Sequence, residues 1–480
     1  MDLRPVFYII GFLLCALSLI LCIPAIVDAY FGNPEWEIFI FTSLISLFVG
    51  IILILANKNK EFSLSIRHAF LLTTISWIFI ALFGSIPFIF SDLKLSFTNA
   101  FFEAMSGITT TGSTVISGLD NLPHGILLWR SLLQWIGGIG IIVIAIAILP
   151  ILKIGGMQLF HTESSDSSEK VLPRAAQVAS AIGIIYFSLT MLCVLFLKIC
   201  GMPIFDSIAH AMTTIATGGF STSDDSIGKY NNLNIEIVIS IFMILGSLPF
   251  VLYLQTVRGN ILSLFKDSQV QFFLLLVFLS VFIVAFWKYQ NTADFFNNFR
   301  SSFFNTISVF TGTGYTTQNF NNWGSFITIL FLFLMVIGGC AGSTTCGIKI
   351  FRLQILYQAA RVQIFKLLQP HTVIVPKYNK VPISESIIMS VMGYFFMFIM
   401  TYIILTLLLS FLGNDLLTSL SGAATSIANV GPGLGNVIGP YKTFAQISDP
   451  SKWVLIIGML VGRLELLAVI VLLTPTFWKD

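Results

Sequence analysis

One short turn decides the fold of this chain: Thr109-Thr110-Thr111-Gly112-Ser113-Thr114. Similar threonine- or glycine-rich turns follow at Ala216-Thr217-Gly218-Gly219-Phe220, Gly312-Thr313-Gly314-Tyr315-Thr316 and Asn429-Val430-Gly431-Pro432-Gly433. Successive turns lie roughly 100 residues apart, and a fixed period of this kind marks an internal repeat. Each turn stands between two long apolar runs. The sequence therefore predicts four repeated units, each built around one turn.

The composition predicts a membrane protein. Of the 480 residues, 56% are hydrophobic and only 10% are charged, whereas a soluble domain carries about a quarter charged residues. The net charge of +3 is too small to indicate a nucleic-acid partner. The six cysteines lie in or beside apolar segments and show neither metal-ligand nor disulfide spacing.

Ten apolar runs are long enough to cross a membrane, which takes about 20 residues. The first is longer than the apolar core of a signal peptide, so we expect it to be a retained span. The runs cover residues 6–29, 37–57, 68–91, 125–152, 175–200, 234–256, 271–290, 325–347, 385–412 and 452–474.

Four shorter, more polar segments precede the turns and are predicted to be half-length pore helices. They are Ser96–Ile108, Ile204–Ile215, Asp294–Phe310 and Asp415–Ile427. Non-helical backbone at membrane depth is tolerated only where protein or water satisfies its polar groups, so four such turns imply a shared cavity. The predicted fold is an all-α polytopic membrane protein with four pseudo-symmetric span–pore helix–filter–span repeats around a central pore. We place an N-terminal transmembrane hairpin at 1–60 and the repeats at 61–153, 154–258, 259–352 and 353–480.

The turns have the chemistry of a potassium filter. Potassium is selected where peptide oxygens replace its hydration shell. Glycine allows the backbone angles that turn carbonyls toward an axis, and a neighbouring threonine can add a hydroxyl. K⁺ is therefore the predicted transported ion. The residues expected to form its rings are Thr110, Thr111, Gly112, Ala216, Thr217, Gly218, Gly312, Thr313, Gly314, Asn429, Val430 and Gly431.

Two further features predict a gate. The eighth run contains a glycine-rich stretch with Gly338, Gly339, Gly342 and Gly347. Glycine costs about 1 kcal/mol in a helix interior, so we expect a loop inside the membrane here. Arg463 is expected near the middle of the tenth span, where a charge must face protein or water. Below a filter it would oppose cation passage, unless it forms a structural ion pair with an acid such as Glu465.

Basic residues set the expected orientation. With both termini in the cytoplasm, most Lys and Arg residues fall on the cytoplasmic side, as the positive-inside rule requires. The longest connection on that side, Lys349–Lys380, is predicted either to dock a soluble partner or to be an amphipathic interfacial helix. No catalytic constellation of His, Asp, Glu or Cys is visible, so no enzyme activity is predicted.

The four turns, the stretch from Gly338, the Gly431-Pro432-Gly433 turn and Gly462-Arg463-Leu464-Glu465 together resemble the Trk/Ktr/HKT cation transporter superfamily. The N-terminal hairpin makes the chain most similar to the membrane subunits of bacterial Trk potassium uptake systems. The resemblance implies a homodimer in the bacterial inner membrane, surrounded by lipid and regulated by a cytoplasmic ring of TrkA-type nucleotide-binding subunits. It also implies that the stretch from Gly338 to Gly347 is an intramembrane gate loop and that Arg463 is the gate arginine.

The chain departs from the family pattern at Thr345 and Cys346, where glycine is usual, and at Gly312, where a hydroxyl residue is common. Serine at the first filter glycine accompanies sodium transport in some plant relatives, so Gly112 favours potassium. The alternative prediction is the potassium-binding subunit of an ATP-driven pump, which also uses four such repeats. Coupling of uptake to protons or sodium stays open.

Overall fold

The computed structural model describes residues 1–58, 65–147, 171–291, 294–371, 375–379 and 381–479. The predicted boundaries at 60 and 153 lie outside these residues. Regular structure in the described part is helical except for one antiparallel pair of two-residue strands, β1 (Lys377–Tyr378) and β2 (Val381–Pro382). The all-α prediction is confirmed.

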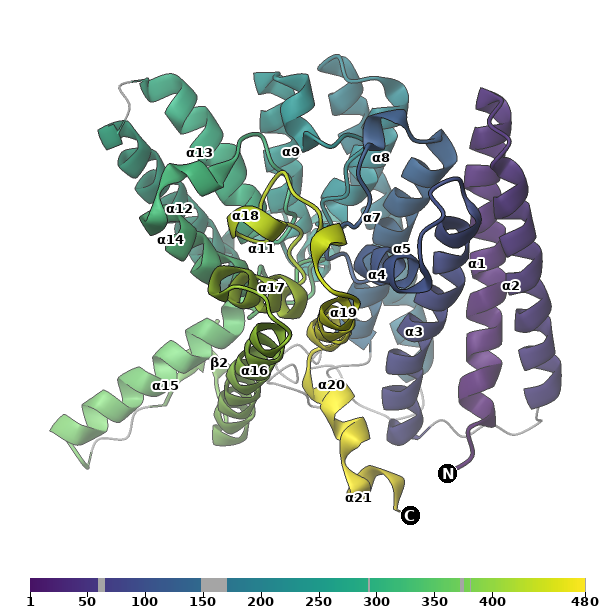
Figure 1. Ribbon diagram of the computed structural model, residues 1–480. Coiled ribbons are helices and arrows are strands. Elements are labelled where there is room, and N and C mark those ends of the chain that lie inside the picture. The colour runs from purple at the N-terminus through teal and green to yellow at the C-terminus, as the bar shows by residue number, and fades with distance from the viewer. Residues whose placement is uncertain (59–64, 148–170, 292–293, 372–374, 380, 480) are drawn as a thin grey trace.

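Seven of the described helices are long and apolar enough to cross a membrane. They are α1 (Arg4–Phe31), α2 (Trp36–Asn57), α3 (Ile66–Phe90), α5 (His124–Ala147), α7 (Val171–Ile199), α12 (Ser268–Asn291) and α16 (Glu385–Phe411). Helices α1 and α2 form a hairpin at one edge, and both chain termini lie at the same end of the molecule (Figure 1). The chain is a polytopic membrane protein.

Four short helices occupy the four predicted pore-helix segments. They are α4 (Phe97–Ile108), α8 (Ile204–Ile215), α13 (Phe295–Phe310) and α17 (Leu416–Ala428). Three of them begin with a side-chain cap: Ser96, Asp294 and Asp415 each accept a hydrogen bond from the backbone amide three residues on. Each helix leads directly into its turn.

Two further predicted spans are broken, which corrects the expectation that these two are continuous. The run 234–256 forms α9 (Leu233–Gly246) and α10 (Phe250–Val257), which meet at 94°. Pro249 lies in this break, and proline cannot donate the amide hydrogen bond that a continuous helix needs. The last span bends by 108° after α19 (Asp449–Arg463). Arg463 is therefore the last residue of its helix rather than the middle of a span.

The eighth run divides as predicted into a helix and a non-helical stretch. Helix α14 (Ser325–Val336) ends before the glycine-rich residues, and α15 (Ile350–Leu368) follows them. Helix α15 projects away from the body of the molecule (Figure 1). The remaining short helices are α11 (Ser263–Lys266), α18 (Gly435–Ile438), α20 (Leu467–Ile470), α21 (Pro475–Trp478) and the 3₁₀ turns Leu119–Asn121, Ser226–Tyr230, Phe320–Trp323, Phe444–Gln446 and Val471–Leu473.

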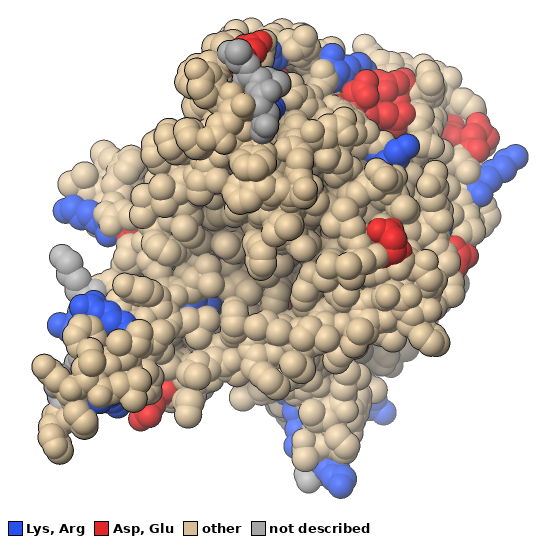
Figure 2. All heavy atoms as spheres, turned by 60° about the vertical axis from the view of Figure 1, so that its left-hand side comes forward, with Lys and Arg blue, Asp and Glu red and all other residues tan. Residues whose placement is uncertain are grey.

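The surface has the character of a membrane protein. In the view of Figure 2, most charged side chains lie near the two ends of the molecule, and the surface between them is nearly all uncharged. Large apolar side chains such as Phe48, Leu195, Phe282 and Leu407 are more than half exposed on the long helices. Exposed apolar surface of this extent is stable only against lipid or another protein.

Candidate functional site

The four turns meet one another in a closed ring. The glycine of each turn faces the backbone of the next turn closely, and at Gly112, Gly219 and Gly314 a side chain would have no room. A β-carbon built on Gly112 would lie 2.0 Å from the Gly218 oxygen, and one built on Gly219 would lie 1.8 Å from the Thr313 oxygen. One built on Gly314 would lie 2.9 Å from the Gly431 nitrogen, and one built on Gly431 would lie 3.3 Å from the Gly112 oxygen. These contacts run from the first turn to the second, third and fourth and back to the first. The turns therefore surround one axis.

The backbone angles set the register of the four turns. At or just after the end of each short helix, one residue is left-handed, with φ of 52° at Thr110, 49° at Thr217, 74° at Gly312 and 52° at Asn429. Two residues later φ is 83° at Gly112, 77° at Gly219 and 84° at Gly314. The second turn therefore aligns as Thr217-Gly218-Gly219, one residue later than the sequence alignment that paired Gly218 with Gly112.

Ala216, predicted to be a ring residue, instead caps its helix. Its φ of −70° and ψ of −10° match the helix-capping angles of Thr311. Its carbonyl accepts a hydrogen bond from the hydroxyl of Thr217 at 2.8 Å. The double glycine at 218–219 fits both registers in the sequence, and only the end of helix α8 distinguishes them.

Two threonine hydroxyls of the turns, those of Thr111 and Thr313, bond to other side chains. The Thr111 hydroxyl lies 2.8 Å from that of Thr109 and accepts a hydrogen bond from the Asn429 amide at 2.9 Å. The Thr313 hydroxyl lies 2.9 Å from that of Thr311. These side-chain bonds brace the first and third turns.

A buried ion pair behind the ring went unnoticed in the sequence. Arg130 of α5 and Glu103 of α4 are both almost fully buried, and Arg130 Nε lies 2.8 Å from Glu103 Oε1. Arg130 also donates to the Ser221 carbonyl at 2.8 Å, and the hydroxyl of Thr114 donates to Glu103 at 2.9 Å. The pair thus ties the chain after the first turn to the chain after the second. Charged residues inside apolar segments are functional candidates, and this signal was available in the sequence.

Two amides make further ties. Gln134 Nε2 donates to the Gly218 carbonyl at 2.7 Å, and its Oε1 accepts from the Phe220 amide at 3.0 Å. Asn429 donates to the Met459 carbonyl of α19 as well as to Thr111. Every described contact of these two side chains holds a turn or joins it to a neighbouring helix.

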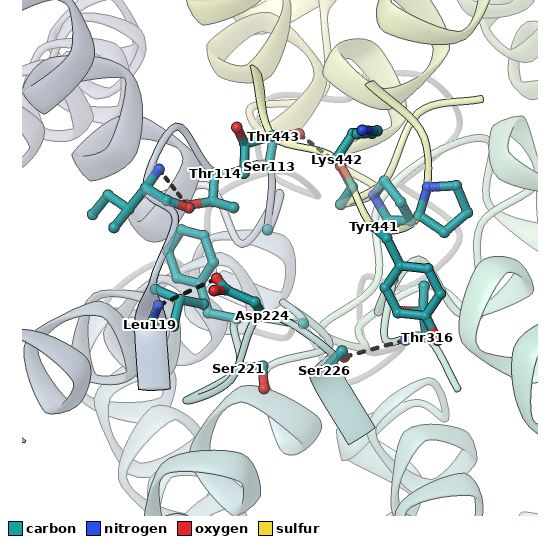
Figure 3. A pocket seen from close by; sticks show the side chains of 18 of the residues that line it. Ser113, Thr114, Leu119, Ser221, Asp224, Ser226, Thr316, Tyr441, Lys442 and Thr443 are labelled. Carbon is teal, nitrogen blue, oxygen red and sulfur yellow. Dashed lines mark hydrogen bonds between the residues drawn. The ribbon is translucent and has the colours of Figure 1, made fainter. Parts of the chain in front are cut away.

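A cavity of about 270 Å³ opens on one side of the ring. The aligned glycines of all four turns line it, and Gly219 rather than Gly218 is among them. Segments after each turn form its walls, with Thr114, Asp224, Thr316 and Lys442 among the side chains shown in Figure 3. Asp224 accepts hydrogen bonds from the Gly118 and Leu119 amides, so it links the first and second units at the mouth.

The glycine-rich stretch 338–347 is a loop held against the break between α9 and α10. The Cys340 amide donates to the Ser247 carbonyl at 3.0 Å, and the Phe250 amide donates to the Gly342 carbonyl at 2.9 Å. The backbone groups freed by the broken helix are thus satisfied by the loop.

The predicted gate glycines have steric reasons to be glycine. A β-carbon on Gly338 would lie 1.7 Å from the Cys346 oxygen, and one on Gly339 would lie 2.6 Å from the Thr345 hydroxyl. Gly342 and Gly347 both have φ of 73°, a region that favours glycine.

Arg463 lies against this loop and is 1% exposed. Its Nη1 donates to the Thr344 carbonyl at 3.0 Å and to Cys346 Sγ at 2.8 Å, and its Nη2 donates to the Gly137 carbonyl of α5 at 2.8 Å. Glu465 instead pairs with Arg352 of α15 at 2.6 Å. The alternative ion pair between Arg463 and Glu465 is therefore not formed.

The loop approaches the ring from the side opposite the cavity. It touches Thr217, whereas the cavity is lined from Gly219 onward. Thr345 and Cys346, which depart from the family pattern, both make contacts: the Thr345 hydroxyl accepts from the Gly339 amide at 3.0 Å, and Cys346 accepts from Arg463.

Comparisons with known proteins give the chain a family. Residues 36–479 match the family model for TrkH, described as a cation transport protein. The Trk system potassium uptake protein TrkI of Halomonas elongata is 43% identical over 99% of this chain and 97% of its own length. The corresponding protein TrkH of Vibrio parahaemolyticus is 37% identical over the full length of both chains. The crystal structure of the potassium transporter TrkH from Vibrio parahaemolyticus matches with a TM-score of 0.92 at 35% identity, covering 100% of both chains.

Proposed function

The chain belongs to the TrkH family of cation transport proteins, and we propose that it takes up potassium across a bacterial inner membrane through the ring of turns. The curated relatives are named as potassium uptake proteins. The observation that carries the proposal is the closed contact of four glycine turns around one axis.

Backbone oxygens of the four turns are the proposed ligands of the ion, replacing its water shell. Each short helix ends at its turn, so the negative end of its dipole favours a cation there. The Gly218 carbonyl accepts one bond from Gln134, and its second lone pair leaves it able to face an ion. The proposed set is Thr110, Thr111 and Gly112; Thr217, Gly218 and Gly219; Gly312, Thr313 and Gly314; and Asn429, Val430 and Gly431.

The loop 338–347 and Arg463 are the proposed gate. A guanidinium held below the ring opposes a dehydrated cation electrostatically, so conduction requires that the arginine shift. An inside-negative potential would drive uptake by about 2.3 kcal/mol per charge per 100 mV.

We further propose the assembly expected of a Trk system: a homodimer in lipid with a cytoplasmic ring of TrkA-type nucleotide-binding subunits. Helix α15 follows the gate loop directly and projects from the body at the end that carries the termini (Figure 1). With the termini in the cytoplasm, movement of α15 by a partner would reach the loop over a short stretch of chain.

The test is uptake of radioactive rubidium by liposomes that contain only the purified protein. We expect uptake that K⁺ competes for and that Na⁺ and Li⁺ leave almost unchanged. Because no ATPase subunit is present, the pump-subunit alternative predicts no uptake. Equal competition by K⁺, Na⁺ and Li⁺ would contradict a potassium filter.

A further inference from the structure

One buried side chain joins the ring to the gate. Thr344 of the loop is 0% exposed, and its hydroxyl lies 3.1 Å from the hydroxyl of Thr217 in the second turn. The same hydroxyl donates to the Gly246 carbonyl at 2.9 Å, at the end of helix α9. The Thr344 carbonyl accepts from Arg463 at 3.0 Å. A turn, a helix break and the gate arginine thus meet at this one residue.

Thr217 has reason to need support. It is β-branched and left-handed, with φ of 49°, a conformation that is a genuine outlier for such residues. Strained backbone persists only where its surroundings over-determine it. The Thr344 hydroxyl donates its hydrogen to the Gly246 carbonyl, so the Thr344 hydroxyl oxygen acts as acceptor for the Thr217 hydroxyl. The Thr217 hydroxyl hydrogen is shared between Thr344 and the Ala216 carbonyl. The loop therefore supplies a partner that fixes the side chain of a ring residue.

Only the second and fourth turns are tied in this way to the gate elements, among the contacts the structure describes. The fourth turn is tied through Asn429 to the Met459 carbonyl on the helix that ends in Arg463. The second is tied through Thr217 to the loop itself. The position of the loop is consequently coupled to the geometry of the ring.

We propose that Thr344 is a positioning residue for ion selectivity. Its hydroxyl holds Thr217 and so fixes the geometry of the second of the four turns that form the ring. The inference rests on the proposed function, since it assigns to the gate loop a part in choosing K⁺ over Na⁺. Loss of this hydroxyl contact removes the support and loosens the ring. Coupling between two sites is reciprocal, so occupancy of the ring by K⁺ in turn stabilises the loop in this position.

The discriminating variant is Thr344→Val, which has nearly the shape of threonine and lacks only the hydroxyl. The backbone bonds of residue 344 to Arg463 and Gly246 do not involve this hydroxyl. The substitution removes both bonds of this hydroxyl, with Thr217 and with the Gly246 carbonyl, and only the first of them reaches the ring. We expect Na⁺ uptake relative to Rb⁺ uptake to rise roughly two- to tenfold, the range for loss of this one hydrogen bond to the ring. The Rb⁺ rate itself should change less than this ratio.

The matched control is Thr345→Val, the same substitution one residue along. Its hydroxyl bonds to the Gly339 amide and to Ser343, both within the loop. It loosens the loop without touching the ring, so the Na⁺/Rb⁺ ratio should stay at the wild-type value. Thr217→Val removes the same inter-residue bond from the other side and should reproduce the Thr344→Val ratio. The Na⁺/Rb⁺ ratio of the double variant should not exceed that of either single variant, because both substitutions remove the same Thr217–Thr344 hydrogen bond.

The possible outcomes distinguish the proposed function from this inference. Wild-type protein that carries no Rb⁺ overturns the proposed function and this inference with it. Selective wild-type protein overturns the inference alone if Thr344→Val keeps its ratio, or if Thr345→Val shifts the ratio as much. If Thr344→Val does not fold, Thr217→Val tests the inference by the same measurement, with Thr345→Val as its control.

Discussion

The ring of turns and the loop against it are both non-helical backbone buried in protein, yet they are held in different ways. Side chains from the surrounding helices hold the ring, among them the Arg130–Glu103 pair and the amide of Gln134. The loop is held mainly by backbone groups of a broken helix, and the Gln269 side chain of α12 accepts a bond from the Ala341 amide. The charged groups bonded to the loop, among the contacts described, are Arg463 and Lys349, and each donates to a loop carbonyl rather than to a carboxylate.

This contrast supports the proposed division between a ring of constant geometry and a gate that moves. Breaking a buried ion pair leaves an uncompensated charge, so the supports of the ring are costly to lose. Bonds between neutral backbone groups contribute little net free energy when water or another carbonyl can replace them. The ring is thus suited to constant geometry, and the loop to displacement.

The largest expected effect comes from removing the charge that holds the ring. Glu103→Gln leaves Arg130 buried without a carboxylate, which costs about 3–5 kcal/mol. We expect a large fall in the thermal unfolding temperature of the purified protein, measured in detergent. The control is Glu35→Gln, at a carboxylate that is 5% exposed and accepts a bond from the Asp92 amide. Equal losses in the two variants would show that burial, rather than ion pairing, sets the cost.

The second prediction tests the close packing of the ring. Gly112→Ser places a β-carbon 2.0 Å from the Gly218 oxygen, at a residue whose φ is 83°. The turns must move apart, so we expect K⁺ over Na⁺ selectivity to fall about tenfold, equivalent to about 1.4 kcal/mol. Competition of Na⁺ with Rb⁺ uptake in liposomes measures it.

Gly118→Ser is the control for this variant, because its φ is 76° but nothing lies within 4 Å of its β-carbon. It carries the same backbone strain outside the ring and should leave selectivity unchanged. Matching losses at Gly112 and Gly118 would contradict the assignment of the ring as the filter.

The third prediction concerns the movable loop. Arg463→Ala removes the charge below the ring and three hydrogen bonds to the loop and α5. We expect the initial rate of Rb⁺ uptake to rise several-fold. Arg361→Ala, on the exposed part of α15, is the control for loss of one positive charge. A lower rate in folded Arg463→Ala protein would make this arginine structural.

How far the sequence could predict these regions depends on how local their signals are. The four glycine turns and the helices before them are visible because turn residues and apolar runs repeat along the chain. The exact register of the second turn is not visible, since Gly218 and Gly219 serve either alignment until the end of α8 is known. Contacts such as Thr217 with Thr344 join residues 127 positions apart, and no pattern in the chain indicates them.

The breaks in the helices show the same limit. Pro249 is a local signal, and the first bend could have been placed there from the sequence. The bend after Arg463 has no proline or glycine at the break; Glu465 and Leu466 have positive φ there, of 60° and 41°. Tertiary contacts compensate this strain: Glu465 pairs with the buried Arg352. An apolar run alone therefore predicted a straight span where packing produces a bend.

The smallest effect is expected at the thiol that bonds to Arg463. Cys346→Ala removes one acceptor at 2.8 Å and leaves the two carbonyl acceptors in place. Losing one weak bond of about 0.5 kcal/mol should raise the Rb⁺ uptake rate about twofold, whereas Cys346→Ser keeps an acceptor and should stay near wild type. Cys340→Ala is the control, because the described hydrogen bonds of this buried loop residue run through its backbone. If Cys346→Ala and Cys340→Ala raise the uptake rate equally, the position of the loop depends on its packing and not on the bond between Cys346 and Arg463.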